Sequence, residues 1–380
     1  MTALDAMARV RWSVPLKNAA GLRAPVVVCD DAGAVYVVGP YQQEGEALRG
    51  CPSVSITKLG ARGTPEWRRL LASVPVHEGR LLVPIVRAAP VPGGGAVLTW
   101  VGRRAERNVV RALRFSTEGS LEWAIAWECE ADAWDPRVGV DAEGACAFWG
   151  SFQGGLAAGA IRLDSGPCEA RYVVRVTSKG RITWAESFRP IAGEPWAVAL
   201  ARDGTLGVVT RIRTPKTEAR PLVDAVALVP FDPNGHPRKN VVGKCEPHTA
   251  IPSLIVAPVS SDSFAVAGYI SGGARFGRRA LPVRSVTPGA ESVYLVGVDG
   301  AGETWARTLS TPQLFGGLSV HGGAERTTLL AGWASGTMSF GGAKITSPPR
   351  GAVLFLAGMR KAREGEGEGN EEGGSQGDRQ

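Results

Sequence analysis

Residues 172–184 read YVVRVTSKGRITW, which is a β-type run, a glycine turn and a tryptophan. A closely related stretch, VYLVGVDGAGETW, occupies residues 293–305. The pattern recurs in steps of 55, 56, 61, 55 and 66 residues. A period of this length with strand-like content predicts a β-propeller, because each small sheet can bury its faces only against its neighbours. The repeated position is held by Trp12, Trp67, Trp123, Trp184, Lys239 and Trp305.

Each unit also contains two β-type runs joined by a tight turn, as in residues 26–39, VVVCDDAGAVYVVG. Aspartate and glycine in such turns suit a hairpin that needs positive φ. A calcium loop would need more densely spaced oxygen ligands, so we interpret these aspartates as turn residues. They are Asp30, Asp31, Asp141 and Asp203. The second run ends at Gly39, Gly102, Gly150, Thr210, Gly268 and Gly332.

The two ends of the repeat region complement each other. The last β-type run, residues 352–358, has no tryptophan strand after it, whereas Trp12 has no such run before it. Pairing them would remove the open edges of the ring. We therefore predict an all-β fold, a six-bladed β-propeller of four-stranded blades over residues 1–360. Its last blade is closed by the N-terminal strand pairing with the C-terminal strands.

Residues 361–380, KAREGEGEGNEEGGSQGDRQ, do not fit the repeat. They contain no aromatic or β-branched side chain, so we predict a disordered acidic tail rich in glycine and glutamate. The tail carries a net charge of -3 and the remaining chain +10. One hypothesis is that the tail folds over a basic surface and regulates access to it. Truncation after Arg360 would then increase the affinity for a partner at low salt.

The chain as a whole has the composition of a folded globular protein, with 44% hydrophobic and 21% charged residues. It contains no apolar run long enough to span a bilayer and no N-terminal signal core, which predicts a cytoplasmic protein for the sequence as it stands. The alternative is that a leader upstream of Met1 is missing and the protein is extracellular or in the cell envelope. The six cysteines form no CxxC pair, so we expect buried free thiols. No cofactor motif is found, and we expect a monomer.

The repeat resembles the bacterial β-propeller repeat family often called SBBP. The closest copies are YVVRVTSKGRITW, VYLVGVDGAGETW and DDAGAVYVVG, together with the turns at Phe276-Gly277 and Phe340-Gly341. The resemblance covers nearly the whole chain, with each copy degenerate. It implies a propeller fold, with the tryptophan run as the outer strand of each blade, and often an extracellular or envelope setting. It implies no reaction.

This strand order places the long links at one end of the blades. They enter the inner strand or follow the second run, and elaborated loops on a rigid scaffold often carry function. The six links after the second run together carry +9, which favours an anionic partner. The alternative is that arginine only keeps long loops soluble. The candidate partner-binding residues are Arg103, Arg104, Arg107, Arg211, Arg213, Arg275, Arg278 and Arg279.

Three aromatic residues lie near the entrances to the inner strands, at the same end of the blades. Trp134, Trp196 and Phe315 follow their repeat tryptophans by 11, 12 and 10 residues. Exposed, they would anchor a partner; buried, they would pack one blade against the next. The repeated outer tryptophans are interpreted as structural.

The sequence favours a non-catalytic binding propeller that contacts an unknown protein or anionic polymer through its arginine-rich end. Nucleic acid would use the same charges, but nothing regular recommends it. The four histidines are far apart and form no triad. The alternative function is a divalent-metal-dependent, lactonase-like hydrolase. Its candidate metal ligands are Asp132, Asp135, Glu194 and Glu246.

Overall fold

A computed structural model of the whole chain describes 24 segments between residues 2 and 360. They are 2–4, 10–13, 26–30, 32–41, 53–60, 62–73, 76–77, 80–81, 86–104, 107–188, 196–213, 224–238, 241–245, 250–260, 263–271, 274–276, 279–281, 292–299, 302–309, 314–322, 327–335, 337–340, 343–346 and 353–360. The predicted tail, 361–380, lies outside the described residues. Within these segments the chain is all β.

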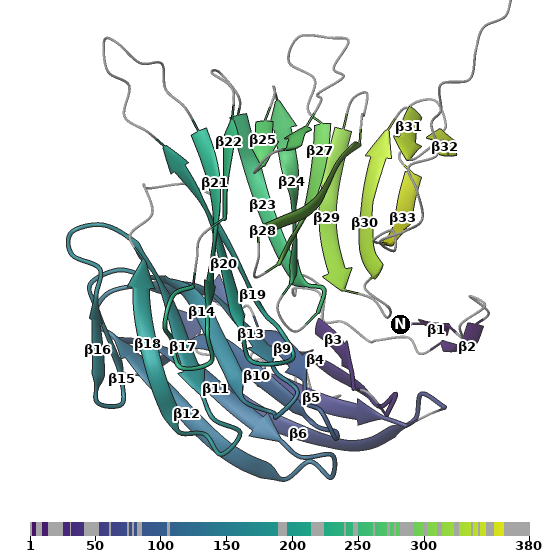
Figure 1. Cartoon of the computed structure of the whole chain (residues 1–380). Helices are drawn as coiled ribbons and strands as arrows, with labels where there is room; N and C mark the ends of the chain where they lie inside the picture. Colours follow the sequence, from purple (N-terminus) through teal and green to yellow (C-terminus); the bar gives the residue numbers. More distant parts are fainter. Residues whose placement is uncertain are drawn as a thin grey trace, which may run out of the picture.

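The larger antiparallel sheets follow one another in chain order (Figure 1). The first contains β3 (Val26–Cys29), β4 (Val35–Tyr41), β5 (Ser53–Leu59) and β6 (Pro65–Ser73). The second contains β9 (Arg87–Pro90), β10 (Ala96–Arg104), β11 (Arg107–Phe115), β12 (Leu121–Cys129), β15 (Gly155–Ala158) and β16 (Ile161–Asp164). The third contains β13 (Ala133–Val140), β14 (Cys146–Phe152), β17 (Ala170–Val176) and β18 (Ile182–Phe188).

The second half of the chain repeats this arrangement. The fourth sheet contains β19 (Trp196–Leu200), β20 (Leu206–Arg213), β21 (Asp224–Phe231), β22 (Val241–Cys245), β25 (Ala274–Phe276) and β26 (Arg279–Leu281). The fifth contains β23 (Ala250–Pro258), β24 (Phe264–Ser271), β27 (Ser292–Asp299) and β28 (Gly302–Leu309). The sixth contains β29 (Leu314–Gly322), β30 (Thr327–Ser335) and β33 (Val353–Arg360). Separate strand pairs are β1 (Thr2–Leu4) with β2 (Val10–Ser13), β7 (Val76–His77) with β8 (Arg80–Leu81), and β31 (Thr337–Phe340) with β32 (Ala343–Thr346).

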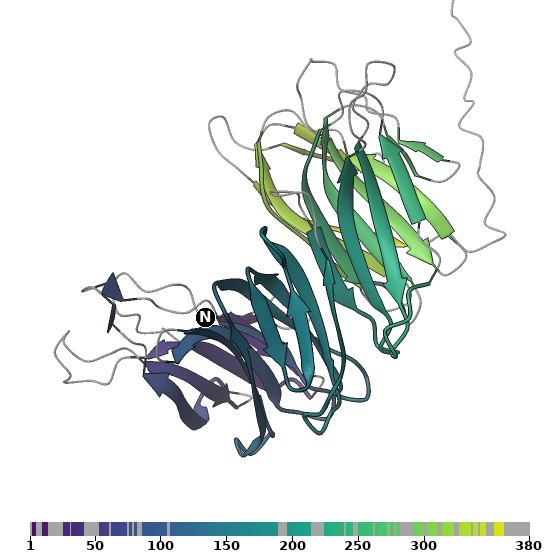
Figure 2. The ribbon, with the colours of Figure 1, turned by 90° about the vertical axis from the view of Figure 1, so that its left-hand side faces the viewer.

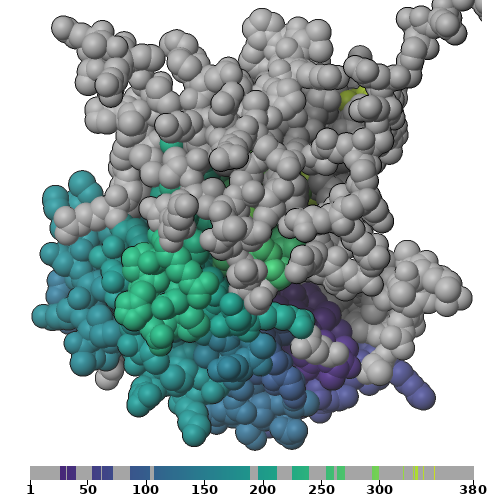
Figure 3. Space-filling view, in the orientation of Figure 1, coloured from purple at the N-terminus to yellow at the C-terminus, as the bar shows by residue number. Residues whose placement is uncertain are grey.

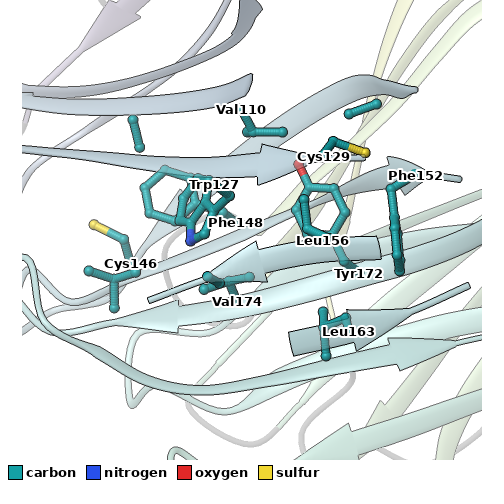
Figure 4. Close-up of a cluster of buried hydrophobic side chains, with 14 of the residues drawn as sticks. Val110, Trp127, Cys129, Cys146, Phe148, Phe152, Leu156, Leu163, Tyr172 and Val174 are labelled. Carbon is teal, nitrogen blue, oxygen red and sulfur yellow. The ribbon is translucent and has the colours of Figure 1, made fainter. Parts of the chain in front are cut away.

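The first strands of successive sheets pack against each other in the order β3, β9, β13, β19, β23 and β29. Five clusters of buried hydrophobic residues fill the seams between consecutive sheets. In the seam between the second and third sheets, Trp127 packs against Phe148 with ring centroids 5.0 Å apart (Figure 4). The sheets are thus buried by their neighbours, as the repeat predicts, in a β-propeller-like arrangement.

Four of the tryptophan runs form outer strands of their sheets, which confirms the predicted strand order for these four, while Lys239 lies outside the described residues. Trp67, Trp184 and Trp305 lie in edge strands, and Trp123 lies in β12, after which only an added hairpin follows. The first three sheets gather in one part of the molecule and the fourth to sixth in another, with the third and fourth sheets meeting between them (Figures 1 and 2). The described surface of the first three sheets is continuous (Figure 3).

Three of the outer tryptophans reach the short turn of the next sheet. The indole Nε1 of Trp67 donates to the Thr117 carbonyl at 2.8 Å, and that of Trp123 donates to the Ser178 carbonyl at 3.0 Å. A Cβ on Gly119, which has φ +80°, would come within 2.8 Å of the Trp67 ring. The glycine turn is therefore needed both for its backbone conformation and for the indole that lies on it. Trp184 donates to the Pro233 carbonyl at 3.0 Å and lies against Gly235 in the same way.

The aspartates of the short turns have the structural role predicted for them. Asp141 accepts hydrogen bonds from the backbone N–H of Glu143 and Ala145, at 3.0 and 2.8 Å. It also forms a buried ion pair with Arg175. Asp30 accepts a hydrogen bond from the Ala34 N–H at 2.8 Å. Asp203 caps its own turn through Thr205, and Asp31 lies outside the described residues.

The described residues do not show the ring closure that was predicted for the N-terminal strand. β2, which carries Trp12, pairs with β1, and the sixth sheet contains three strands in the described part of the chain. The predicted pairing of the Trp12 strand with β33 is not shown among the described strands.

The cysteines only partly follow the prediction of buried thiols. Cys129 and Cys146 are buried, and burial raises the pKa of the Cys146 thiol to about 12. Cys29 and Cys168 are exposed free thiols, so for these two the prediction is wrong. Neither lies in one of the buried seams, where a small apolar side chain is favoured. Cys51 lies outside the described residues, as does the side chain of Cys245.

Candidate functional site

A cavity of about 220 Å³ lies where the inner strands of the third and fourth sheets begin. Trp134 near the start of β13 and Trp196 at the start of β19 contribute indoles from the two sheets. The first residues of β13 and β19 lie at this end of their sheets, opposite the short turns. The lining residues are Trp134, Asp135, Arg137, Trp149, Ser151, Arg171, Trp196 and Ala197.

A β-bulge shapes the third-sheet side of the cavity. Trp134 pairs with Ser151 and Arg137 pairs with Trp149, so an extra residue stands on β13 between the two pairs. Asp135, inside the bulge, has φ 47°, and it is the only non-glycine residue in the described segments with positive φ. Bulges redirect side chains and often lie next to functional sites. Backbone strain of this kind costs about 1–3 kcal/mol and persists where surrounding contacts hold it.

Two arginines hold the Asp135 carboxylate. Arg87 NH2 lies 3.3 Å from Asp135 Oδ1, while Arg137 NH2 and Nε lie 2.9 and 3.0 Å from Oδ2. All three side chains are partly exposed to solvent. One carboxylate balances only one of the two guanidinium charges, so the group carries an excess positive charge. Each guanidinium has five N–H donors, which leaves donors free for a further acceptor.

Arg171 forms the floor of the cavity on the third sheet. Its NH1 group contacts both the Ser151 hydroxyl and the Glu169 carboxylate. Its guanidinium carbon lies 5.4 Å from the centroid of the Trp196 ring, in cation–π geometry. The pKa of Arg171 is lowered by burial, and the negative charge of Glu169 opposes this effect only in part. Arg171 thus packs against the Trp196 indole and links the third sheet to the fourth.

The three indoles differ in exposure. Trp149 is 8% exposed and belongs to the hydrophobic seam between the third and fourth sheets. Trp196 is half-buried at the edge of the same seam. Trp134 is 36% exposed, one of the few large hydrophobic side chains on the described surface. The cavity therefore combines a fixed apolar wall with one indole that is free to contact a ligand.

Sequence reasoning found two of the cavity's aromatic residues and missed its arginines. Trp134 and Trp196, predicted as partner anchors, meet at the cavity, whereas Phe315 lies in β29 of the sixth sheet. Arg171 is the last residue of the link 151–171, whose net charge is zero, so the sum of charges along that link did not indicate it. Arg137 lies inside an inner strand, and only its position two residues after Asp135 could have indicated an ion pair.

Of the arginines predicted to bind a partner, Arg107 and Arg211 have described side chains, and neither is among the residues that line this cavity. Arg103 and Arg104 end β10 and Arg107 begins β11, so they belong to a tight hairpin between paired strands. Arg211 and Arg213 lie in the last part of β20. Arg275 and Arg279 lie in β25 and β26, and Arg278 lies outside the described residues.

Some of the predicted long loops are regular structure. The link after β14 forms the hairpin β15–β16, which pairs with β12 of the second sheet. The link after β24 forms β25–β26, which pairs with β22 of the fourth sheet. These hairpins continue the outer edge of the preceding sheet, because an edge strand offers unpaired backbone groups. Both hairpins therefore lie at the outer edges of the sheets and not at the inner-strand entrances.

The candidate metal ligands are not assembled in the part of the chain that the structure describes. Asp135 is held by arginines, and Asp132 accepts a hydrogen bond from Asn108 Nδ2 at 2.8 Å on the exposed surface. Glu194 and Glu246 lie outside the described residues. Within the described segments no three His, Cys, Asp or Glu side chains are grouped as a metal would need.

No described helix is long and apolar enough to cross a membrane.

Comparisons with known proteins add a distant likeness of fold. No family model matches the chain, and no curated protein matches it. Similar solved structures include the polysaccharide lyase Uly1, with 7% identity, a TM-score of 0.44, and coverage of 87% of this chain and 76% of the lyase. A subtype N11 neuraminidase-like protein of A/flat-faced bat/Peru has 9% identity, a TM-score of 0.39, and coverage of 90% and 88%.

A third solved structure is a puromycin hydrolase variant in complex with PGG. It has 13% identity and a TM-score of 0.37, and the alignment covers 88% of this chain but only 52% of the hydrolase. All three TM-scores lie below 0.5, and identities this low carry no information about activity.

Proposed function

We propose that this chain is a non-catalytic binding protein that contacts its partner at the cavity between the third and fourth sheets. The observation that carries the proposal is the convergence of Trp134 and Trp196 with Arg137 and Arg171 around one concave site. Exposed aromatic and arginine side chains are the residue types that most often dominate binding energy at interfaces. The strained Asp135 at the same place is a second sign of a site selected for something other than stability.

The partner that suits this site is an acidic protein or an anionic polymer. Arg87 and Arg137 share one carboxylate, and further arginines lie at the link ends of β10 and β20. A positive field at the mouth of a concave site raises the local concentration of anions and is screened by salt.

We further propose that the fold is a six-bladed ring. The sixth sheet has three strands in the described part of the chain, and the Trp12 segment has the sequence pattern of a further outer strand. Its pairing with β33 would close the ring and cover an open edge. Deletion of residues 1–13 should then lower the melting temperature by more than about 5 °C, since a whole outer strand is lost. An unchanged melting temperature would contradict closure.

Binding can be tested by surface plasmon resonance, with immobilised polyglutamate and polygalacturonate as probes at 0.05 and 0.3 M NaCl. We expect at least one probe to bind, with an affinity that falls with salt. The double variant Trp134→Ala/Trp196→Ala should weaken binding more than about tenfold. Charge reversal at Arg275, Arg278 and Arg279 tests the wider arginine-rich surface. If neither probe binds, or if the double variant binds as tightly as the native chain, the proposed site is wrong.

A further inference from the structure

The cavity is too small for a large ligand and suits one ring-sized group. Its volume of about 220 Å³ lies below the roughly 300–1,000 Å³ of pockets that enclose drug-sized molecules. The rest of a ligand that occupies it must therefore extend out of the mouth, across the link ends of the third and fourth sheets. A unit of a longer chain fits this description better than an enclosed cofactor does.

The residues around the cavity favour a ligand that combines three properties. Trp134 and Trp196 offer flat apolar faces, which favour a ring with an apolar side. The free guanidinium donors of Arg137 in the lining, and of Arg87, which contacts Asp135 from outside it, favour a carboxylate, which arginine can bind through two parallel hydrogen bonds. Asp135 lies between these arginines, and its carboxylate can only accept hydrogen bonds when ionised.

The presence of both an acceptor, Asp135, and guanidinium donors distinguishes between the candidate ligands. A sulfate or phosphate ion would satisfy the arginines but has neither an apolar face nor donors for Asp135. An acidic peptide side chain likewise supplies a carboxylate without hydroxyl groups. A sugar ring that carries a carboxylate supplies an apolar ring face, hydroxyl donors and the anionic acceptor together.

We propose that the cavity lined by Trp134, Asp135, Arg137, Arg171 and Trp196 binds a hexuronate unit of an acidic polysaccharide. This inference rests on the proposed function and narrows it to one class of partner. In this arrangement the carboxylate lies at the excess guanidinium donors of Arg137 and Arg87. The ring lies against Trp134, and a ring hydroxyl donates to Asp135.

The test is isothermal titration of the full chain with a galacturonate oligomer. Neutral galacto-oligosaccharide of the same length, sodium sulfate and polyglutamate serve as the other probes, and free galacturonate separates the single unit from the polymer. We expect the galacturonate oligomer to bind at least about tenfold more tightly than the neutral oligomer, because one charge-assisted contact is lost. The free monosaccharide should bind more weakly at the same site and compete with the oligomer.

Two variants locate the contact. Arg137→Gln should reduce the affinity for the galacturonate oligomer about tenfold while changing the affinity for the neutral oligomer less than twofold. Arg162→Gln is the matched control, because it removes one positive charge from the exposed hairpin β15–β16, and it should leave both affinities unchanged. Equal loss in both variants would show a general charge effect and would overturn the proposal.

The outcomes also separate this inference from the proposed function. If polyglutamate binds in a Trp134-dependent way and galacturonate does not, the site is a binding site but the ligand class is wrong. If sulfate or the neutral oligomer competes as well as galacturonate, the hexuronate proposal is overturned as well. If no probe binds at the cavity, both proposals fall.

Discussion

The two ends of the sheets use the same residue types in opposite ways. At the short-turn end, Trp67 and Trp123 each lie on a glycine and donate to a backbone carbonyl of the next sheet. At the link end, Trp134 lies beside a cavity and is more than one-third exposed. At the turn end, the indoles therefore form contacts between sheets. At the link end, the exposed indole of Trp134 is accessible to a ligand.

The largest effect is expected at the buried ion pair of the turn end. Asp141→Ala removes the partner of Arg175, whose side chain is 6% exposed, and leaves its charge buried without compensation. We expect the free energy of unfolding to fall by about 3–5 kcal/mol, measured by urea denaturation. Asp203→Ala is the control, because Asp203 caps a turn from an exposed position, and it should cost about 1 kcal/mol. Equal losses would mean that the buried pair adds nothing beyond turn formation.

The next largest loss of stability is expected for alanine at one of two glycines in short turns. Gly119→Ala places a Cβ within 2.8 Å of the Trp67 ring, whereas Gly33→Ala meets nothing within 4 Å. The two residues have almost the same φ, +80° and +81°, so the backbone cost cancels in the comparison. We expect Gly119→Ala to lose about 2–3 kcal/mol of unfolding free energy and Gly33→Ala about 1 kcal/mol. Thermal unfolding that shows no difference between them would remove the contact with the indole as a reason for the glycine.

Two arginines on β11 allow the turn end and the link end to be compared for the same charged side chain. Arg114, at the turn end, donates to the Gly144 carbonyl at 2.7 Å and is mostly buried. Arg107, at the link end, is 64% exposed and lies 3.8 Å from Glu128. Arg114→Ala should cost about 2 kcal/mol, since a buried carbonyl loses its donor. Arg107→Ala should change stability by less than about 0.5 kcal/mol, as exposed ion pairs usually do.

Much of the fold could be predicted from the sequence because its determinants are local and repeated. The tryptophan period, the glycine at each short turn and the Asp–Gly hairpins each report a contact that recurs from sheet to sheet. The hairpins β15–β16 and β25–β26 could not be predicted in this way, since each pairs with a strand of another sheet, far away in the sequence.

The site could be predicted only in part. Trp134 and Trp196 were found because they occupy similar positions in successive units, at the first or second residue of an inner strand. Arg87, Arg137 and Arg171 come together only through the bulge in β13 and the packing of neighbouring sheets. Net charge summed along a link cannot detect such a group, because Glu169 cancels Arg171 in the sum while leaving it in place as part of the cavity.

The central claim is that tryptophan is structural at the turn end and binds a ligand at the link end. It is tested most directly by comparing Trp123→Ala with Trp134→Ala in urea unfolding and in titration with the galacturonate oligomer. We predict that Trp123→Ala lowers the free energy of unfolding by about 2–4 kcal/mol and retains affinity while folded. Trp134→Ala should change stability by less than about 0.5 kcal/mol and lose affinity at least about tenfold. A Trp134→Ala protein that is as destabilised as Trp123→Ala, or that binds every anionic probe unchanged, would contradict the account.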